Sequence, residues 1–193
     1  DDKETVHMSN STSPDSGVIV TGGASGIGLA SAEALAEVGR PVAIWDINAE
    51  RSATVAADIA QRFGVATVGV GVDLSQVGNI APALQQTRAA LPRIGGLVHA
   101  AGISLAVPVE ELTEAAWDAV LSVNLKALPF MVQQLRSALV EQPGSAVVGI
   151  ASINATLGNH MNPAYTASKG GMLSLVRSLA DDLARDGIRI NSV

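Results

Sequence analysis

Short apolar runs rich in β-branched residues alternate along the chain with longer alanine-rich segments that carry charges at helical spacing. This alternation is typical of βαβ units. The apolar runs are nearly continuous, so they predict strands that are covered on both faces, as in a doubly wound parallel α/β sheet. The predicted strands span residues 18–21, 42–46, 65–72, 97–100, 146–151 and 188–193.

Residues typical of helix ends lie between the predicted strands. The expected N-caps are Asn48, Ser75 and Thr113. The expected C-terminal stops are Gly39 and Gly64. Pro129 interrupts the helix that follows Thr113, because it has no N–H to donate to the carbonyl of Leu125. We therefore expect that helix to bend between residues 124 and 129.

The overall composition narrows the class of protein. The 193 residues are 48% hydrophobic and carry a net charge of −6, with scattered basic residues, which argues against nucleic-acid and membrane partners. The absence of cysteine suits a cytoplasmic protein. His7, His99 and His160 are too dispersed to predict a metal site. Residues 1–16 are polar and predict a disordered tail, in which residues 1–7 are either native or derived from a cloning junction.

The first predicted strand runs directly into a glycine-rich turn, TGGASGIG, at residues 21–28. Gly22, Gly26 and Gly28 permit a tight turn, a close approach of the backbone to a pyrophosphate, and close packing of helix on strand. The following helix N-terminus offers free N–H groups to the phosphates. The alternative is a plain turn, because glycines serve that purpose as well.

Two acidic residues end predicted strands. Asp46 lies 18 residues beyond Gly28 and is placed to accept hydrogen bonds from the adenosine ribose hydroxyls. Its charge would repel a 2′-phosphate, which favours NAD over NADP. The alternative role for Asp46 is to cap the helix that starts near Asn48. Asp73 is a candidate for an adenine contact or, alternatively, for a cap of the next helix.

Tyr165 is the only tyrosine of the chain, and Lys169 follows it at helical spacing. Side chains four residues apart share one face of a helix, where an ammonium group stabilises an ionised phenol. This pair therefore predicts an acid/base function. The alternative is a buried core tyrosine followed by a surface lysine.

Taken together, these residues resemble the short-chain dehydrogenase/reductase family. TGGASGIG is similar to the family's TGxxxGxG loop, and AYTASK carries its YxxxK signature. Ser152 precedes Tyr165 by the family's usual 13 residues, VNLKA places Asn124 at the position of a family asparagine, and HAAG at residues 99–102 resembles NNAG. The resemblance covers the chain from residue 17 to 193 and implies one Rossmann-type domain.

The resemblance also implies an NAD-dependent enzyme that interconverts a small-molecule secondary alcohol and a ketone, assembled as a homodimer or homotetramer. The catalytic residues that it implies are Asn124, Ser152, Tyr165 and Lys169. The cofactor-binding residues are Gly22, Ser25, Gly26, Ile27, Gly28, Asp46, Asp73, Ala101, Gly102, Tyr165 and Lys169. The candidate substrate contacts are Ser152, Asn154, His160 and Tyr165.

The chain departs from the family pattern in two places. His99 replaces the first asparagine of NNAG and is expected to be a hydrogen-bonded, half-buried strand residue. The chain ends at Val193, before the seventh strand that the family normally has, so we expect a fragment that lacks a C-terminal part.

Two other functions stay open at this point. A 3-oxoacyl-carrier-protein-type reductase would normally use NADPH and have a basic residue around the glycine loop, where Ala24 and Ser25 are neutral. A non-catalytic dinucleotide-binding scaffold is the other alternative.

Overall fold

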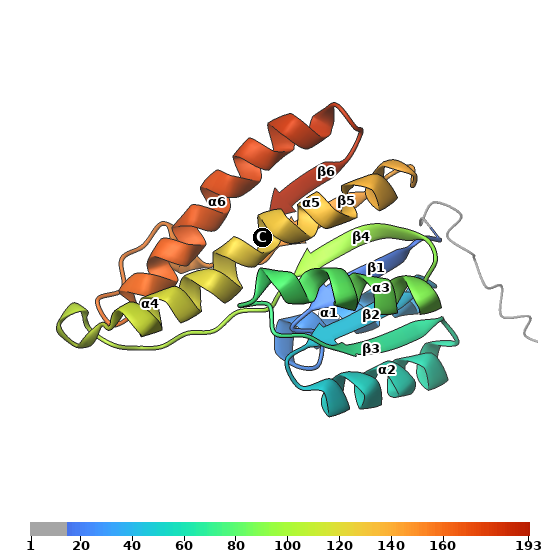
Figure 1. Ribbon diagram of the computed structural model, residues 1–193, viewed down its shortest axis with the longest axis horizontal. Coiled ribbons are helices and arrows are strands. Elements are labelled where there is room, and N and C mark those ends of the chain that lie inside the picture. The colour runs from blue at the N-terminus through green and yellow to red at the C-terminus, as the bar shows by residue number, and fades with distance from the viewer. Residues whose placement is uncertain (1–14) are drawn as a thin grey trace, which may run out of the picture.

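The computed structural model describes residues 15–193 and contains one parallel sheet (Figure 1). The strands are β1 (Gly17–Thr21), β2 (Val42–Asp46), β3 (Thr67–Gly71), β4 (Ile94–His99), β5 (Ala146–Gly149) and β6 (Arg189–Ser192). Their order across the sheet is β3-β2-β1-β4-β5-β6, which confirms the predicted doubly wound arrangement. Within residues 15–193 the sheet has six strands and no seventh, as expected.

The predicted strand ends differ from the observed ones by up to three residues. β4 begins at Ile94 rather than at residue 97. The prediction missed its first residues because Gly95 and Gly96 weaken the sequence pattern of a strand, although both pack closely beside β1 in the sheet. A Cβ on Gly96 would lie 3.0 Å from a side-chain carbon of Val18. β5 ends at Gly149 rather than at residue 151, so Ser152 follows the strand by three residues.

Six α-helices connect the strands. They are α1 (Gly26–Glu37), α2 (Ala49–Phe63), α3 (Ile80–Ala90), α4 (Glu114–Leu121), α5 (Ala127–Val140) and α6 (Pro163–Ala184). The side chains of Asn48 and Thr113 accept backbone N–H groups as the predicted N-caps, and Gly64 ends α2 with a φ of 69°. Ser75 is not an N-cap, because a short 3-10 turn at Val77–Asn79 comes before α3.

Alternate residues of each central strand enter two different cores. Val18, Val20 and Ile44 pack with α1 and α2 on one face of the sheet. Ile19 and Trp45 pack on the other face, in the core that also holds residues of α3, α5 and α6. The prediction of helices on both faces is therefore confirmed.

The sequence predicts a bend between residues 124 and 129, and the structure has a change of helix type close to this position. A π-helical turn at Ser122–Lys126 separates α4 from α5, and α5 continues through Pro129. A π-helical turn is wider than an α-helical one, so it accommodates the proline, which has no N–H to donate within the helix. The whole segment Glu114–Val140 is long and apolar enough to cross a membrane by length and composition. However, Leu128, Met131 and Leu135 are fully buried in the core of the sheet, as in the core helix of a globular domain.

Most of the predicted tail, residues 1–14, lies outside the described residues. The last tail residue, Ser16, is 2% exposed, and Arg40 Nη2 donates to its carbonyl oxygen at 2.8 Å. The packed part of the chain therefore includes Ser16.

Candidate active site

The glycine-rich turn connects β1 to α1 with a conformation that requires glycine. Gly22 and Gly26 have φ values of 63° and 52°, which L-residues rarely adopt. A Cβ on Gly28 would overlap the carbonyl oxygen of Gly22, and a Cβ on Gly22 would lie 2.9 Å from backbone atoms of Ala101. The turn therefore packs against the chain that follows β4, and the first turn of α1 presents its free N–H groups there.

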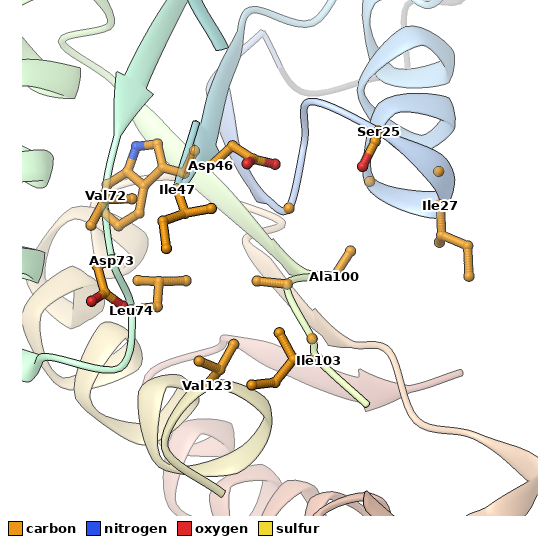
Figure 2. A pocket seen from close by; sticks show the side chains of 16 residues that line it. Ser25, Ile27, Asp46, Ile47, Val72, Asp73, Leu74, Ala100, Ile103 and Val123 are labelled. Carbon is orange, nitrogen blue, oxygen red and sulfur yellow. The ribbon is translucent and has the colours of Figure 1, made fainter. Parts of the chain in front are cut away.

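A cleft of about 400 Å³ opens beside this turn, at the point where the strand order reverses between β1 and β4. Ligands bind at this point in doubly wound sheets. Figure 2 shows that its walls come from the ends of several strands and from the start of α1. The lining residues are Gly22, Ser25, Gly26, Ile27, Gly28, Trp45, Asp46, Ile47, Val72, Asp73, Leu74, Ala100, Ala101, Gly102, Ile103 and Val123.

Nine of the eleven candidate cofactor residues line this cleft, from Gly22 to Gly102. The other two, Tyr165 and Lys169, are on α6 and are not part of its lining. The glycine cradle and the size of the cleft fit a dinucleotide.

Asp46 and Asp73 line the cleft and also hold the local backbone. Asp46 Oδ2 accepts the Ala24 N–H at 3.3 Å, and its Oδ1 accepts the Asn48 N–H at 3.1 Å. Asp73 Oδ1 accepts the Ser75 N–H at 2.9 Å. For both residues the structural role and access to the cleft coexist.

Lys169 lies beside Tyr165 on α6, as the spacing predicts. Its Nζ lies 5.5 Å from the centroid of the Tyr165 ring and donates to the carbonyl oxygen of Ile150 at 2.6 Å. Lys169 is 5% exposed, and this burial lowers the pKa of its ammonium group. The pair therefore places a largely desolvated positive charge next to a half-buried phenol.

Asn124, in the π-helical turn, links two segments of the site. Its Nδ2 donates to the Ile103 carbonyl at 2.9 Å and to Ser168 Oγ at 3.1 Å, and its Oδ1 accepts the Ile103 N–H at 2.8 Å. Ser168 Oγ in turn donates to the carbonyl of Tyr165 at 2.7 Å. Asn124 thus ties the chain after β4 to the helix that carries Tyr165. The sequence prediction missed Ser168, although it immediately precedes Lys169.

The remaining candidates lie between β5 and α6. Ser152 is half-buried and its Oγ accepts the Asn154 N–H at 3.2 Å, which leaves its hydroxyl proton free to donate to a substrate. Asn154 is half-buried and His160 is exposed. Neither Asn154 nor His160 lines the cleft beside the glycine-rich turn.

His99 is fully buried rather than half-buried, with 1% exposure. Thr21 Oγ1 accepts the Ala101 N–H at 3.1 Å and forms a buried hydrogen bond with His99 Nδ1 at 2.9 Å. Burial, with a smaller contribution from the charge of Lys169, lowers the pKa of His99 to about 4.

This lowered pKa predicts a loss of stability in acid. Because the unfolded histidine titrates near 6.5, the unfolded chain binds a proton between pH 6.5 and 4 that the folded chain does not. The free energy of unfolding should therefore fall by about 3 kcal/mol as the pH decreases through this window. Urea unfolding of the wild type and of His99→Asn at pH 7, 5.5 and 4.5 measures how steeply the free energy of unfolding of each protein falls with decreasing pH. Parallel curves would contradict the prediction, and His160→Asn, at an exposed site, is the control.

Comparison with known proteins gives consistent matches. Residues 16–193 match the short chain dehydrogenase family. The chain is 38% identical to a probable galactose dehydrogenase from Rhizobium meliloti over 93% of this chain and 70% of that protein. It is 35% identical to D-threitol dehydrogenase from Mycolicibacterium smegmatis over 91% of this chain and 67% of that one.

A solved structure from Sinorhizobium meliloti 1021, assigned as a short-chain alcohol dehydrogenase, superimposes with a TM-score of 0.88 at 32% identity. The match covers 93% of this chain and 71% of that structure.

Proposed function

The chain belongs to the short-chain dehydrogenase family, and we propose that it prefers NAD(H) and interconverts a secondary alcohol and a ketone. Membership of the family makes it an oxidoreductase that uses a nicotinamide dinucleotide and acts on alcohol groups. The observation that carries the proposal is the pairing of a half-buried Tyr165 with the buried ammonium of Lys169, 5.5 Å from the phenol ring.

In this proposal the bound dinucleotide supplies the hydride acceptor. Tyr165 takes the proton from the substrate hydroxyl during oxidation and returns it during reduction. Lys169 stabilises the phenolate, because a charge about 5 Å away contributes about 3 kcal/mol at an effective dielectric constant of 20. In the proposal Lys169 also holds the nicotinamide ribose hydroxyls.

Ser152 and Asn124 complete the proposed machinery. Ser152 donates its hydroxyl proton to the substrate oxygen, where negative charge develops. The main-chain carbonyl of Asn124 holds a water that connects Lys169 to solvent. The side chain of Asn124 is already engaged with Ile103 and Ser168, so it also fixes the position of this part of the site.

The proposed substrate is a polyol or a sugar. Asn154 and His160 offer polar groups between Ser152 and Tyr165, and two relatives are named as dehydrogenases of galactose and D-threitol. Association into a homodimer or homotetramer and a cytoplasmic location stay predictions from the sequence.

Oxidation of a panel of sugars, polyols and simple secondary alcohols, followed as NADH absorbance, tests this function. We expect turnover of at least one polyol or sugar with NAD⁺, and tighter binding of NADH than of NADPH, because Asp46 repels a 2′-phosphate. Fluorescence titration measures both affinities. Tighter binding of NADPH would contradict the assigned role of Asp46, and dinucleotide binding without turnover of any substrate would favour a scaffold instead.

A further inference from the structure

His99 carries a buried ring nitrogen that no group in the described part of the chain uses. Its side chain is 1% exposed, and its Nδ1 is hydrogen-bonded to Thr21 Oγ1 at 2.9 Å. Among residues 15–193, its Nε2 is buried without a hydrogen-bond partner. Whichever ring nitrogen carries the proton, Nε2 is a donor or an acceptor. A buried polar atom without a partner costs free energy, so we expect Nε2 to bind a polar group.

The main chain of the π-helical turn lies beside the His99 ring. Burial, followed by the charge of Lys169, lowers the pKa of His99, and the backbone carbonyls of Asn124 and Val123 act in the opposite direction. An uncharged carbonyl has this effect only at close approach. Neither carbonyl forms a hydrogen bond to Nε2. A carbonyl close to a buried nitrogen but not bonded to it is an arrangement that a bridging water completes.

The same turn has a carbonyl without a donor of its own. The N–H of Ala127 is already used within the π-helical turn, and Pro129 has no N–H. Within the helix, only the N–H of Leu128 remains for the carbonyls of Val123 and Asn124. One of these two carbonyls therefore needs a donor from outside the helix.

Lys169 reaches this part of the site from α6. A Cβ on Gly102 would lie 3.4 Å from Asn124 Oδ1 and 3.8 Å from Lys169 Nζ. Lys169 Nζ donates to the carbonyl of Ile150, and the N–H of Ile150 donates to the carbonyl of His99 at 3.0 Å. The ammonium group, the π-helical turn and the end of β4 therefore meet at one place.

We propose that a buried water lies between His99 Nε2 and the main-chain carbonyl of Asn124, and that His99 is a positioning residue for this water. The inference rests on the proposed function, in which a water on that carbonyl connects Lys169 to solvent. A water can donate to the carbonyl and still bond Nε2 as a donor or as an acceptor, so it suits either tautomer. Two protein partners then hold the water in place for proton transfer to and from Lys169. His99 acts through the water and does not touch the substrate.

The kinetic test compares two variants of His99. His99→Phe keeps a ring in the core but removes both nitrogens, whereas His99→Asn keeps an amide that can bond a water. We expect His99→Phe to lower kcat about 10-fold, the value of one hydrogen bond, with KM for the alcohol and NADH affinity nearly unchanged. The solvent isotope effect on kcat should rise, because proton transfer then limits turnover. His99→Asn should recover most of kcat and the isotope effect of the wild type.

Ser145→Ala is the control for loss of a buried hydrogen bond. Ser145 Oγ donates to the carbonyl of Leu139 at 2.7 Å, and Ser145 precedes β5 at the end opposite to Gly149, which pairs with His99. This variant should lose stability without a change in kcat or in the solvent isotope effect. A lower kcat in His99→Phe with an unchanged isotope effect would mean that His99 only supports the fold, and would overturn the inference.

A high-resolution crystal structure of the wild type tests the same water without any substitution. We expect an ordered water within hydrogen-bonding distance of both His99 Nε2 and the carbonyl of Asn124. A direct bond between these two atoms, or no water at Nε2, would overturn the inference and leave the proposed function intact. A wild type that binds NADH but oxidises no alcohol would overturn the proposed function and the positioning role together, whatever the crystal structure shows.

Discussion

Tyr165→Phe is expected to lower kcat about 1000-fold while NADH affinity stays nearly unchanged. The phenylalanine ring keeps the packing of Tyr165 on α6 and its contact with Lys169, whose Nζ lies 5.5 Å from the ring centroid. It removes only the hydroxyl that exchanges a proton with the substrate. Loss of kcat with retained binding is the result expected when a group acts in the chemical step.

Turnover is measured with the best substrate of the panel, and binding by energy transfer from Trp45 to NADH. Trp45 is suitable because it lines the cleft and is held by a hydrogen bond from its Nε1 to Thr87 Oγ1 at 2.8 Å. Thr166→Val is a matched control, since it removes a hydroxyl of the same helix that is buried without a partner among the described residues. Activity of Tyr165→Phe close to that of the wild type would refute the assigned role.

Gly28→Ala is expected to lower kcat/KM for the dinucleotide about 100-fold. The new Cβ would overlap the carbonyl oxygen of Gly22, so the loop backbone must shift. Displacements of about 1 Å in groups that position a ligand cost about 100-fold in rate. The strain should also lower the free energy of unfolding by about 1–3 kcal/mol.

Gly78→Ala is the control for this substitution. A Cβ on Gly78 meets no atom within 4 Å and its φ is not positive, so this variant should keep wild-type stability and activity. Dinucleotide affinity is measured by titration, and unfolding by urea. If Gly28→Ala binds NADH as tightly as the wild type does, the glycine cradle is not the pyrophosphate site.

The sequence was sufficient to predict the sheet and the location of the cleft. Each strand of a parallel sheet is a short, nearly continuous apolar run, and ligand-binding residues follow the carboxyl ends of such runs. This is why Asp46, Asp73 and the glycine turn were identified, and why the structure places them around one cleft. The Tyr165–Lys169 spacing was equally informative, because it needs only local helical geometry.

Contacts between distant segments were not predictable in the same way. The hydrogen bond from Arg51 to Ala24 spans 27 positions and depends on how closely α2 packs on β3. The burial of His99 depends on the helix that covers β4, which a single residue in a strand pattern does not reveal. Ser75 resembles an N-cap, but the chain makes a 3-10 turn first and α3 starts at Ile80.

The β1–β4 pairing at the centre of the sheet has a consequence for how the protein folds. Thr21 and His99, which pair directly before the cleft-lining residues Gly22 and Ala100, are 78 positions apart in the chain. Pairing of such distant segments requires closure of a long loop, which slows folding. The strands before β4 have nearer neighbours to pair with, so the cleft forms only when the two halves of the sheet join. A dinucleotide therefore recognises only molecules that have completed this late step, and it shifts the folding equilibrium toward them by mass action.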